Sequence, residues 1–229
     1  LSEVEALSAL EPYGADNPRP LFCIQGLTVE SLQNVGQNKH LKLRFSKGSV
    51  QLDGIFFSAT AETCGAGQGD RVDAAFYLNV NEFRSRCTVQ LQLADLRLSR
   101  EPSVREREDL ERLRRFFGGE GLTPQEAVHL LPERAQFAAC WRALDRFLPP
   151  EGALQAAYLP LLRKLEKGLG GVNPFARAAV CLQVFCERGL LQIEGAGDER
   201  SFARVPISGK ADLEASPYVQ TLRAILGRR

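Results

Sequence analysis

The spacing of apolar residues along the chain changes once, near residue 100. Before that point apolar and polar residues mostly alternate, with turn-forming residues at regular intervals, which is typical of β-strands. We predict strands over residues 21–31, 40–46, 50–57, 71–82 and 86–98. A short helical insert is predicted over residues 59–66, between the third and the fourth strands. This order favours a five-stranded OB-fold barrel, although an SH3-like barrel or a small sandwich would also have five strands.

Beyond residue 100 the apolar residues recur every three or four positions, as they do in amphipathic helices. Thr123-Pro124-Gln125-Glu126 has the composition of a helix start, with a capping hydroxyl, proline and glutamate in order. Helices are predicted over residues 105–117, 133–147, 158–168, 173–188 and 217–226, with a further helix that starts at residue 123, and a β-hairpin over 190–194 and 201–205. This half therefore predicts a mainly α, winged-helix-like domain with one hairpin, and a plain helical domain with a hairpin fits equally well.

Proline dominates the segment that precedes the first predicted strand, residues 10–22. Proline lacks an amide donor and fixes φ, so this segment is neither a helix nor a central strand. Asn17 before Pro18 is a strong turn signal. We therefore expect the end of a linking helix and a Pro-rich connector over residues 1–20, an OB-fold domain over 21–100 and the C-terminal domain over 101–229.

The composition is that of an ordinary globular protein, with 44% apolar and 25% charged residues. No run approaches the roughly 18 apolar residues of a membrane span, and the N-terminus is too acidic for a signal peptide, so we expect a cytoplasmic protein without a membrane partner. The cysteines lack metal-ligand spacing and the two histidines, His40 and His129, are far apart, which predicts no metal site. Because the sequence contains no methionine, we expect it to be a piece of a longer protein.

The second predicted strand carries the most informative polar pattern. His40, Lys42 and Arg44 alternate with three apolar residues. In a closed barrel the apolar set fills the interior and the basic set lies on the outer wall, where OB-folds commonly bind oligonucleotides. Lys39 adds a charge in the preceding loop, and the two-residue repeat of about 6–7 Å suits a phosphate backbone. The alternative is a solvated edge on which lysine prevents aggregation.

Binding to single strands also requires aromatic rings on which bases can stack. Phe56 and Phe57 are adjacent and cannot both face the core, and Gly54 permits a bulge that decides which ring points outward. Phe83 lies in a predicted loop beside two arginines, an arrangement that fits stacking and phosphate contact, although the ring could equally cap the barrel end. The candidate nucleic-acid-binding residues are Lys39, His40, Lys42, Arg44, Phe56, Phe83, Arg84, Arg86 and Gln90.

Several motifs resemble one protein family. Glu11-Pro12-Tyr13-Gly14, Asn17-Pro18, Pro20 and Phe22, together with residues 40–43, 69–73, 81–83 and 89–91, resemble the junction and OB domain of RecJ-type single-strand-specific exonucleases. Tyr13 stands where the family more often has phenylalanine. A weaker similarity at residues 179–191 and 210–216 points to the extra C-terminal domain of some bacterial members.

The resemblance implies a 5′→3′ exonuclease of recombination and repair that uses Mn²⁺ or Mg²⁺ and binds single-stranded DNA. The Asp-His-His motif that holds metal in this family does not occur in the sequence. We therefore expect this chain to bind single strands without a catalytic residue, a metal or a cofactor of its own.

Two other functions stay open for the C-terminal half. It could dock a protein partner such as a helicase or a single-strand-binding protein. It could also be a duplex-DNA-binding regulator with residues 173–188 as recognition helix, although the apolar composition of that helix is typical of a buried one.

Overall fold

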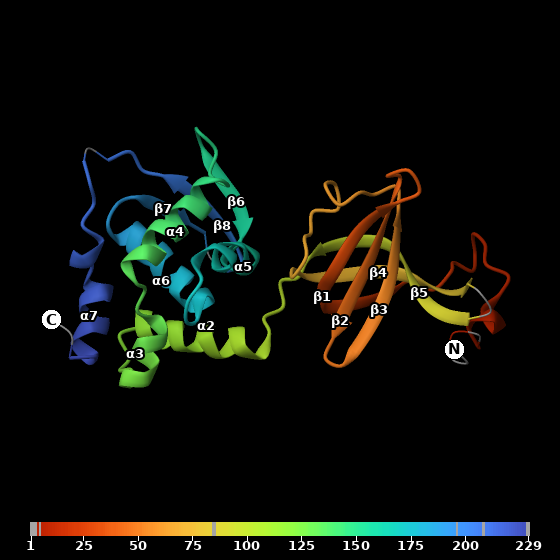
Figure 1. The fold of residues 1–229 in the computed structure, drawn as a ribbon, viewed down its shortest axis with the longest axis horizontal. Coiled ribbons are helices and arrows are strands. Elements are labelled where there is room, and N and C mark those ends of the chain that lie inside the picture. The colour runs from red at the N-terminus through yellow and green to blue at the C-terminus, as the bar shows by residue number, and fades with distance from the viewer. Residues whose placement is uncertain (1–3, 5, 84–85, 196, 208, 228–229) are drawn as a thin grey trace. The chain divides into compact units, whose positions relative to one another are not determined.

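A computed structural model describes residues 4, 6–83, 86–195, 197–207 and 209–227, with the side chains of residues 81–83 and 86 left out (Figure 1). The chain divides into two compact units, Leu1–Glu101 and Pro102–Arg229. We call them the barrel unit and the helical unit. Their buried side chains form two separate hydrophobic clusters, so each unit has a core of its own.

The barrel unit contains a closed five-stranded barrel with strand order β1-β2-β3-β5-β4. The strands are β1 (Phe22–Val35), β2 (His40–Lys47), β3 (Val50–Phe57), β4 (Arg71–Phe83) and β5 (Arg86–Leu98). Strands β3 and β5 are parallel and all other pairs are antiparallel. Register shifts at Ile24/Leu27 and Val29/Ser31 bend β1, which lets it pair with β4 through its first half and with β2 through its second. The predicted OB-like barrel is confirmed.

Strict alternation on β2 fills the barrel interior. Leu41, Leu43 and Phe45 are at most 1% exposed. Gly54 of β3 lies against this core, because a Cβ atom there would stand 2.9 Å from a ring carbon of Phe45. The β2–β3 register runs without a shift, so the bulge that we expected at Gly54 is not formed. Glycine is needed at this position for close packing instead.

The segment 59–66 forms a turn and not the predicted helix. The backbone N–H groups of Thr63 and Cys64 both donate to the carbonyl of Thr60, at 3.1 and 2.9 Å. Gly65 then takes a left-handed conformation with φ 73°, which ends the turn before a helix can continue. Cys64 is buried in the barrel core, so the segment contributes packing without helical structure.

The Pro-rich connector folds back onto the barrel. A 3₁₀ helix, η1 (Ala6–Leu10), precedes a turn closed by backbone hydrogen bonds between Gly14 and Asn17. The Asn17 side chain donates to the carbonyls of Leu10 and Pro12, at 2.7 and 3.0 Å. Arg19 then donates to the carbonyl of Leu78 in β4 at 2.7 Å. The connector is therefore attached to β4 at Leu78, beyond the last residue of β4 that pairs with β1.

The helical unit combines six α-helices with a three-stranded sheet in the described part of the chain (Figure 1). The helices are α2 (Val104–Phe117), α3 (Pro124–Leu130), α4 (Arg134–Asp145), α5 (Tyr158–Leu169), α6 (Pro174–Glu187) and α7 (Pro217–Ile225), and a short 3₁₀ helix, η2 (Leu213–Ala215), precedes α7. The sheet has the order β6-β8-β7, with β6 (Ala153–Ala157), β7 (Leu191–Glu194) and β8 (Glu199–Arg204). The mainly α fold with a hairpin is confirmed, and β6 is an additional strand.

Helix α6 forms the centre of the helical core. Ten of its residues are buried, including Arg177.

Within the described part of the chain no single helix is long and apolar enough to cross a membrane. Helices α5 and α6 reach the required length and composition only as a pair that is bent by 107°.

A buried ion pair joins α2 to α5. The guanidinium of Arg163 donates from Nε to Oε1 of Glu106 at 2.7 Å and from Nη2 to Oε2 at 2.9 Å. Both side chains are 9% exposed. Glu106 also accepts from the backbone N–H of Ser103 at 2.6 Å and so completes a capping box at the start of α2.

Candidate nucleic-acid interface

Two rows of side chains cross the outer wall of the barrel from β2 to β4. Strand register places Lys42, Ile55, Gln92 and Tyr77 in one row, and Arg44, Asp53, Gln90 and Asn79 in the next. His40 pairs with Phe57 beyond the first row. We call these ten residues the outer-wall track. It extends over four strands because the parallel β3–β5 contact closes the sheet between them.

The track begins with positive charge on β2. The Lys42 and Arg44 side chains are exposed, and Lys39 lies exposed in the loop before the strand. Nε of Arg44 donates to Oδ1 of Asp53 at 3.0 Å, with both side chains about half exposed, 52% and 42%. An exposed pair of this kind contributes only about 0–1 kcal/mol, so a phosphate can compete with Asp53 for the guanidinium.

The aromatic ring beside this charge is Phe57 and not Phe56. The Phe56 ring packs against the barrel core, because its register neighbours are the inward residues Leu41 and Leu93. Phe57 is 48% exposed and meets the ring of His40 edge to face, with centroids 5.0 Å apart. We predicted Phe56 for the outer wall from the sequence, and the unbroken β2–β3 register corrects this.

His40 is held in one orientation. Its Nδ1 accepts a hydrogen bond from the backbone N–H of Ser58 at 3.2 Å, so in this arrangement Nδ1 carries no proton. The neutral ring then presents Nε2–H as a donor. His40 therefore offers one hydrogen-bond donor beside the exposed Phe57 ring.

The far end of the track carries a second aromatic group, which we did not predict from the sequence. The Arg19 guanidinium lies over the Tyr77 ring, 5.1 Å from its centroid, and also donates to Oδ1 of Asn79. Asn79 in turn donates to Oε1 of Gln92 at 2.7 Å. The alternation of β4, with Phe76 and Leu78 inward, would have indicated Tyr77 and Asn79 as outward residues. Gln90 was predicted and lies in the track.

Three of the predicted residues cannot be placed. The Phe83 and Arg86 side chains and the whole of Arg84 lie outside the described part of the structure. Their role in binding stays a prediction from the sequence.

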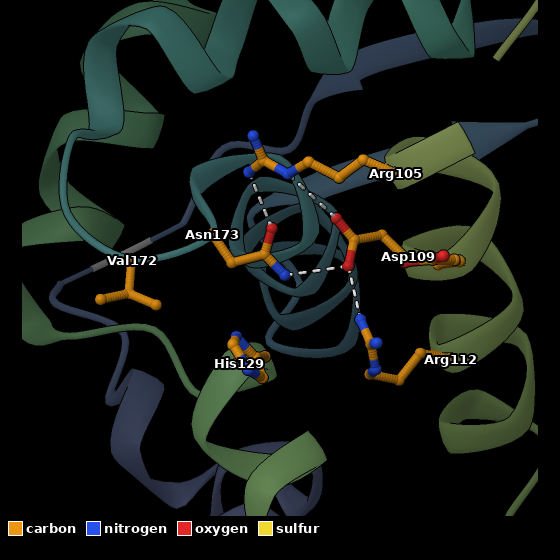
Figure 2. Close-up of a pocket in the computed structure, with 7 residues that line it drawn as sticks. Arg105, Asp109, Arg112, His129, Val172 and Asn173 are labelled. Atoms are coloured by element: carbon orange, nitrogen blue, oxygen red, sulfur yellow. Dashed lines mark hydrogen bonds and ion pairs between the residues drawn. The ribbon is translucent and has the colours of Figure 1, made fainter. Parts of the chain in front are cut away.

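Figure 2 shows a polar pocket of about 360 Å³ in the helical unit, lined by α2, α3 and the loop before α6. Asp109, 3% exposed, accepts hydrogen bonds from Arg112 at 2.5 Å and from Asn173 at 2.9 Å. Arg105 donates to the Asn173 side chain at 3.0 Å, and His129 lies on the opposite wall. These contacts between Asp109, the two arginines and Asn173 join α2 to the start of α6. They are the contacts of a structural network.

No group of three or more His, Cys, Asp or Glu side chains that could hold a metal ion is found among the described residues.

Comparison with known proteins finds similarity to one protein family. A profile of the RecJ OB domain matches residues 1–95. The single-stranded-DNA-specific exonuclease RecJ of Thermus thermophilus is 32% identical over 179 residues, which is 72% of this chain and 24% of that protein. Its namesake from Bacillus subtilis is 27% identical over 100 residues, 43% of this chain and 13% of that protein. A crystal structure of the Thermus thermophilus RecJ with Mg²⁺ aligns with a TM-score of 0.33 and 26% identity, over 44% of this chain and 14% of that one.

The chain spans about a quarter or less of the length of the curated relatives that it matches. The matching residues begin before the connector and end within β5, so they include the attachment of the connector to β4 and nearly the whole barrel. Residues 1–95 of the chain match the RecJ OB-domain family.

Proposed function

We propose that the outer-wall track binds single-stranded DNA with little dependence on sequence. The observation that carries this proposal is the continuous path from the Lys42/Arg44 charges through the partly exposed amides of Gln90, Gln92 and Asn79 to Tyr77 and Arg19. Cations suit the phosphates, and the exposed Phe57 ring offers a surface on which any base can stack, while Arg19 lies over Tyr77 at the far end. The partly exposed amides provide polar contacts of low specificity.

We further propose that this chain is part of a RecJ-like 5′→3′ exonuclease of DNA recombination and repair in the cytoplasm. Its support is the match to the RecJ OB domain and the names of the two curated relatives, which are single-stranded-DNA-specific exonucleases. The parent enzyme would use Mn²⁺ or Mg²⁺, held by residues other than those described here. The barrel would then grip the strand while the chemistry occurs elsewhere.

A salt titration tests the binding proposal. We expect fluorescein-labelled oligo-dT to bind the chain with an affinity that falls as salt rises, because phosphate contacts release counterions. With three phosphates neutralised, the slope of log K against log salt is about −2, or about a twentyfold loss between 50 and 200 mM salt. Fluorescence anisotropy measures this directly. Binding that does not respond to salt would contradict the proposal.

Phe57→Ala is expected to weaken oligo-dT binding about tenfold at constant salt. The loss follows from the removal of one base-stacking surface, a contact of about 1–3 kcal/mol. The slope against salt should not change, since no charge is removed. Phe147→Ala, which removes a partly exposed ring from the helical unit, is the matched control. Equal affinities of the two variants would rule out stacking on Phe57.

For the helical unit we propose a winged-helix-like module that docks a protein partner, such as a helicase or a single-strand-binding protein. The order α4-β6-α5-α6-β7-β8 with a β6-β8-β7 sheet supports the winged-helix assignment. A groove of about 630 Å³ lined by Phe137, Trp141 and Ile207 supports docking. Pull-down of purified partners with residues 102–229 tests it. The structure does not favour binding of duplex DNA by α6 as a recognition helix, because α6 is buried along most of its length.

A further inference from the structure

A cleft of about 420 Å³ lies between the connector and β4 in the barrel unit. Leu7, Pro20 and Val80 contribute apolar walls, and Asn79 and the Tyr13 hydroxyl contribute polar groups. Its volume falls in the range of about 300–1,000 Å³ that is usual for small-molecule sites, which are mostly apolar with a few converging polar groups. The cleft therefore has the size of a ligand site, and its lining mixes apolar and polar groups.

The cleft continues the outer-wall track. Arg19 and Asn79 line the cleft and also contact each other at the far end of the track. We expect a strand that crosses the barrel wall from β2 towards β4 to end at Tyr77 and Asn79, and Asn79 also lines the cleft. If the track binds single-stranded DNA, the group that reaches the cleft from the track is a nucleotide of the bound strand.

The lining distinguishes between the parts of a nucleotide. Glu11 lines the cleft and repels a phosphate, whereas Arg19 attracts one to the mouth. The Tyr13 hydroxyl donates to the carbonyl of Leu7 at 3.0 Å, so its oxygen remains an acceptor for an N–H group. Val80 is 41% exposed and would be covered by a flat apolar surface. These features fit a nucleobase, with its phosphate outside.

We propose that this cleft is a base pocket that takes one nucleobase of the bound single strand, at the end of the track. The proposal rests on the proposed function of the track. It gives the connector a role in DNA binding, since η1, Tyr13 and Arg19 form one wall of the pocket.

The test uses the full chain and a set of oligo-dT strands of one length, each with an abasic site at a different position. We expect one position near one end of the strand to lose about tenfold in affinity when its base is removed, since a bound base contributes a stacking contact. A 2-aminopurine placed at that position should change its fluorescence on binding more than one placed mid-strand. A uniform small loss at all positions would overturn the pocket.

A variant that fills the cleft tests whether that loss of affinity arises there. Val80→Trp should reduce the affinity for the intact strand about tenfold and leave the affinity for the critical abasic strand unchanged, because the two changes remove the same contact. Val50→Trp adds the same ring at an exposed position on β3 outside the cleft and should have no effect. If Val80→Trp weakens intact and abasic strands equally, the pocket proposal fails while salt-dependent binding stands. If no strand binds in a salt-dependent way, the track and the pocket both fail.

Discussion

Replacing both Lys42 and Arg44 by glutamate is expected to weaken oligo-dT binding roughly a hundredfold. Each change removes a charged contact to phosphate, at about 1.5 kcal/mol for a hydrogen bond to a charged group, so the pair contributes about 3 kcal/mol. The slope of log K against log salt should also become shallower by about 1.4, because two phosphates lose their cations. Fluorescence anisotropy over a salt series measures both quantities.

The matched control changes the same charges elsewhere. Arg142→Glu/Arg146→Glu alters two exposed arginines of α4 and its C-terminal end. In both double variants the net charge falls from +1 to −3, since each substitution changes the charge by two. The control should bind within about threefold of the unchanged chain. Two variants that lose affinity equally would show that net charge, and not the track, governs binding.

The second large effect concerns stability. Arg163→Met is expected to destabilise the helical unit by about 3–5 kcal/mol, because it leaves the buried Glu106 carboxylate without its cation. For a unit of this size the melting temperature should fall by about 10–15 °C. Trp141 is the only tryptophan in the chain and packs on Phe185 in this unit, so its fluorescence reports the unfolding of the helical unit alone.

Two further variants test the cause of that effect. Arg114→Met breaks the exposed pair with Glu111 and should cost at most about 1 kcal/mol. Glu106→Gln/Arg163→Met removes both buried charges and should recover part of the stability that Arg163→Met loses. A double variant as unstable as Arg163→Met would mean that the arginine acts through packing.

The same pair predicts a pH dependence. Burial alone raises the pKa of Glu106, but hydrogen bonds from Arg163 and from the Ser103 backbone, with the Arg163 charge, lower it below the usual 4.5. A carboxylate whose pKa is lower in the folded state stabilises above the unfolded pKa and loses that contribution as pH falls through the folded pKa. The stability difference between the unchanged chain and Arg163→Met should be full near pH 7 and shrink as pH falls, because Glu106 buried without its cation takes up a proton at a higher pH than Glu106 in the unchanged chain.

Local pattern predicts much of this fold. The alternation of β2 was sufficient to separate Leu41, Leu43 and Phe45 from the outward basic residues, because a strand has a period of two. The helix start predicted at Thr123 is likewise the capping box that begins α3. Such features depend on neighbouring residues alone.

The missed features depend on residues far apart in the chain. Arg19 reaches Asn79 across 60 positions, and no local signal indicates that contact. The choice between Phe56 and Phe57 follows from register with β2 and from closure by β5. Strand β6, with the weak strand formers Ala153, Ala156 and Ala157, forms because β8 pairs with it. Tertiary pairing overrides local preference in each case.

The alternation of outward and inward residues on the barrel strands has a consequence for how the sequence of this barrel can diverge in evolution. Lys42, Asp53 and Ile55 each have inward neighbours in sequence, so a substitution at one of them alters the outer-wall track and leaves the interior packing intact. Ligand preference and folding can therefore vary independently. Related barrels should differ most at every second position of β2, β3, β4 and β5, while the positions between them stay apolar.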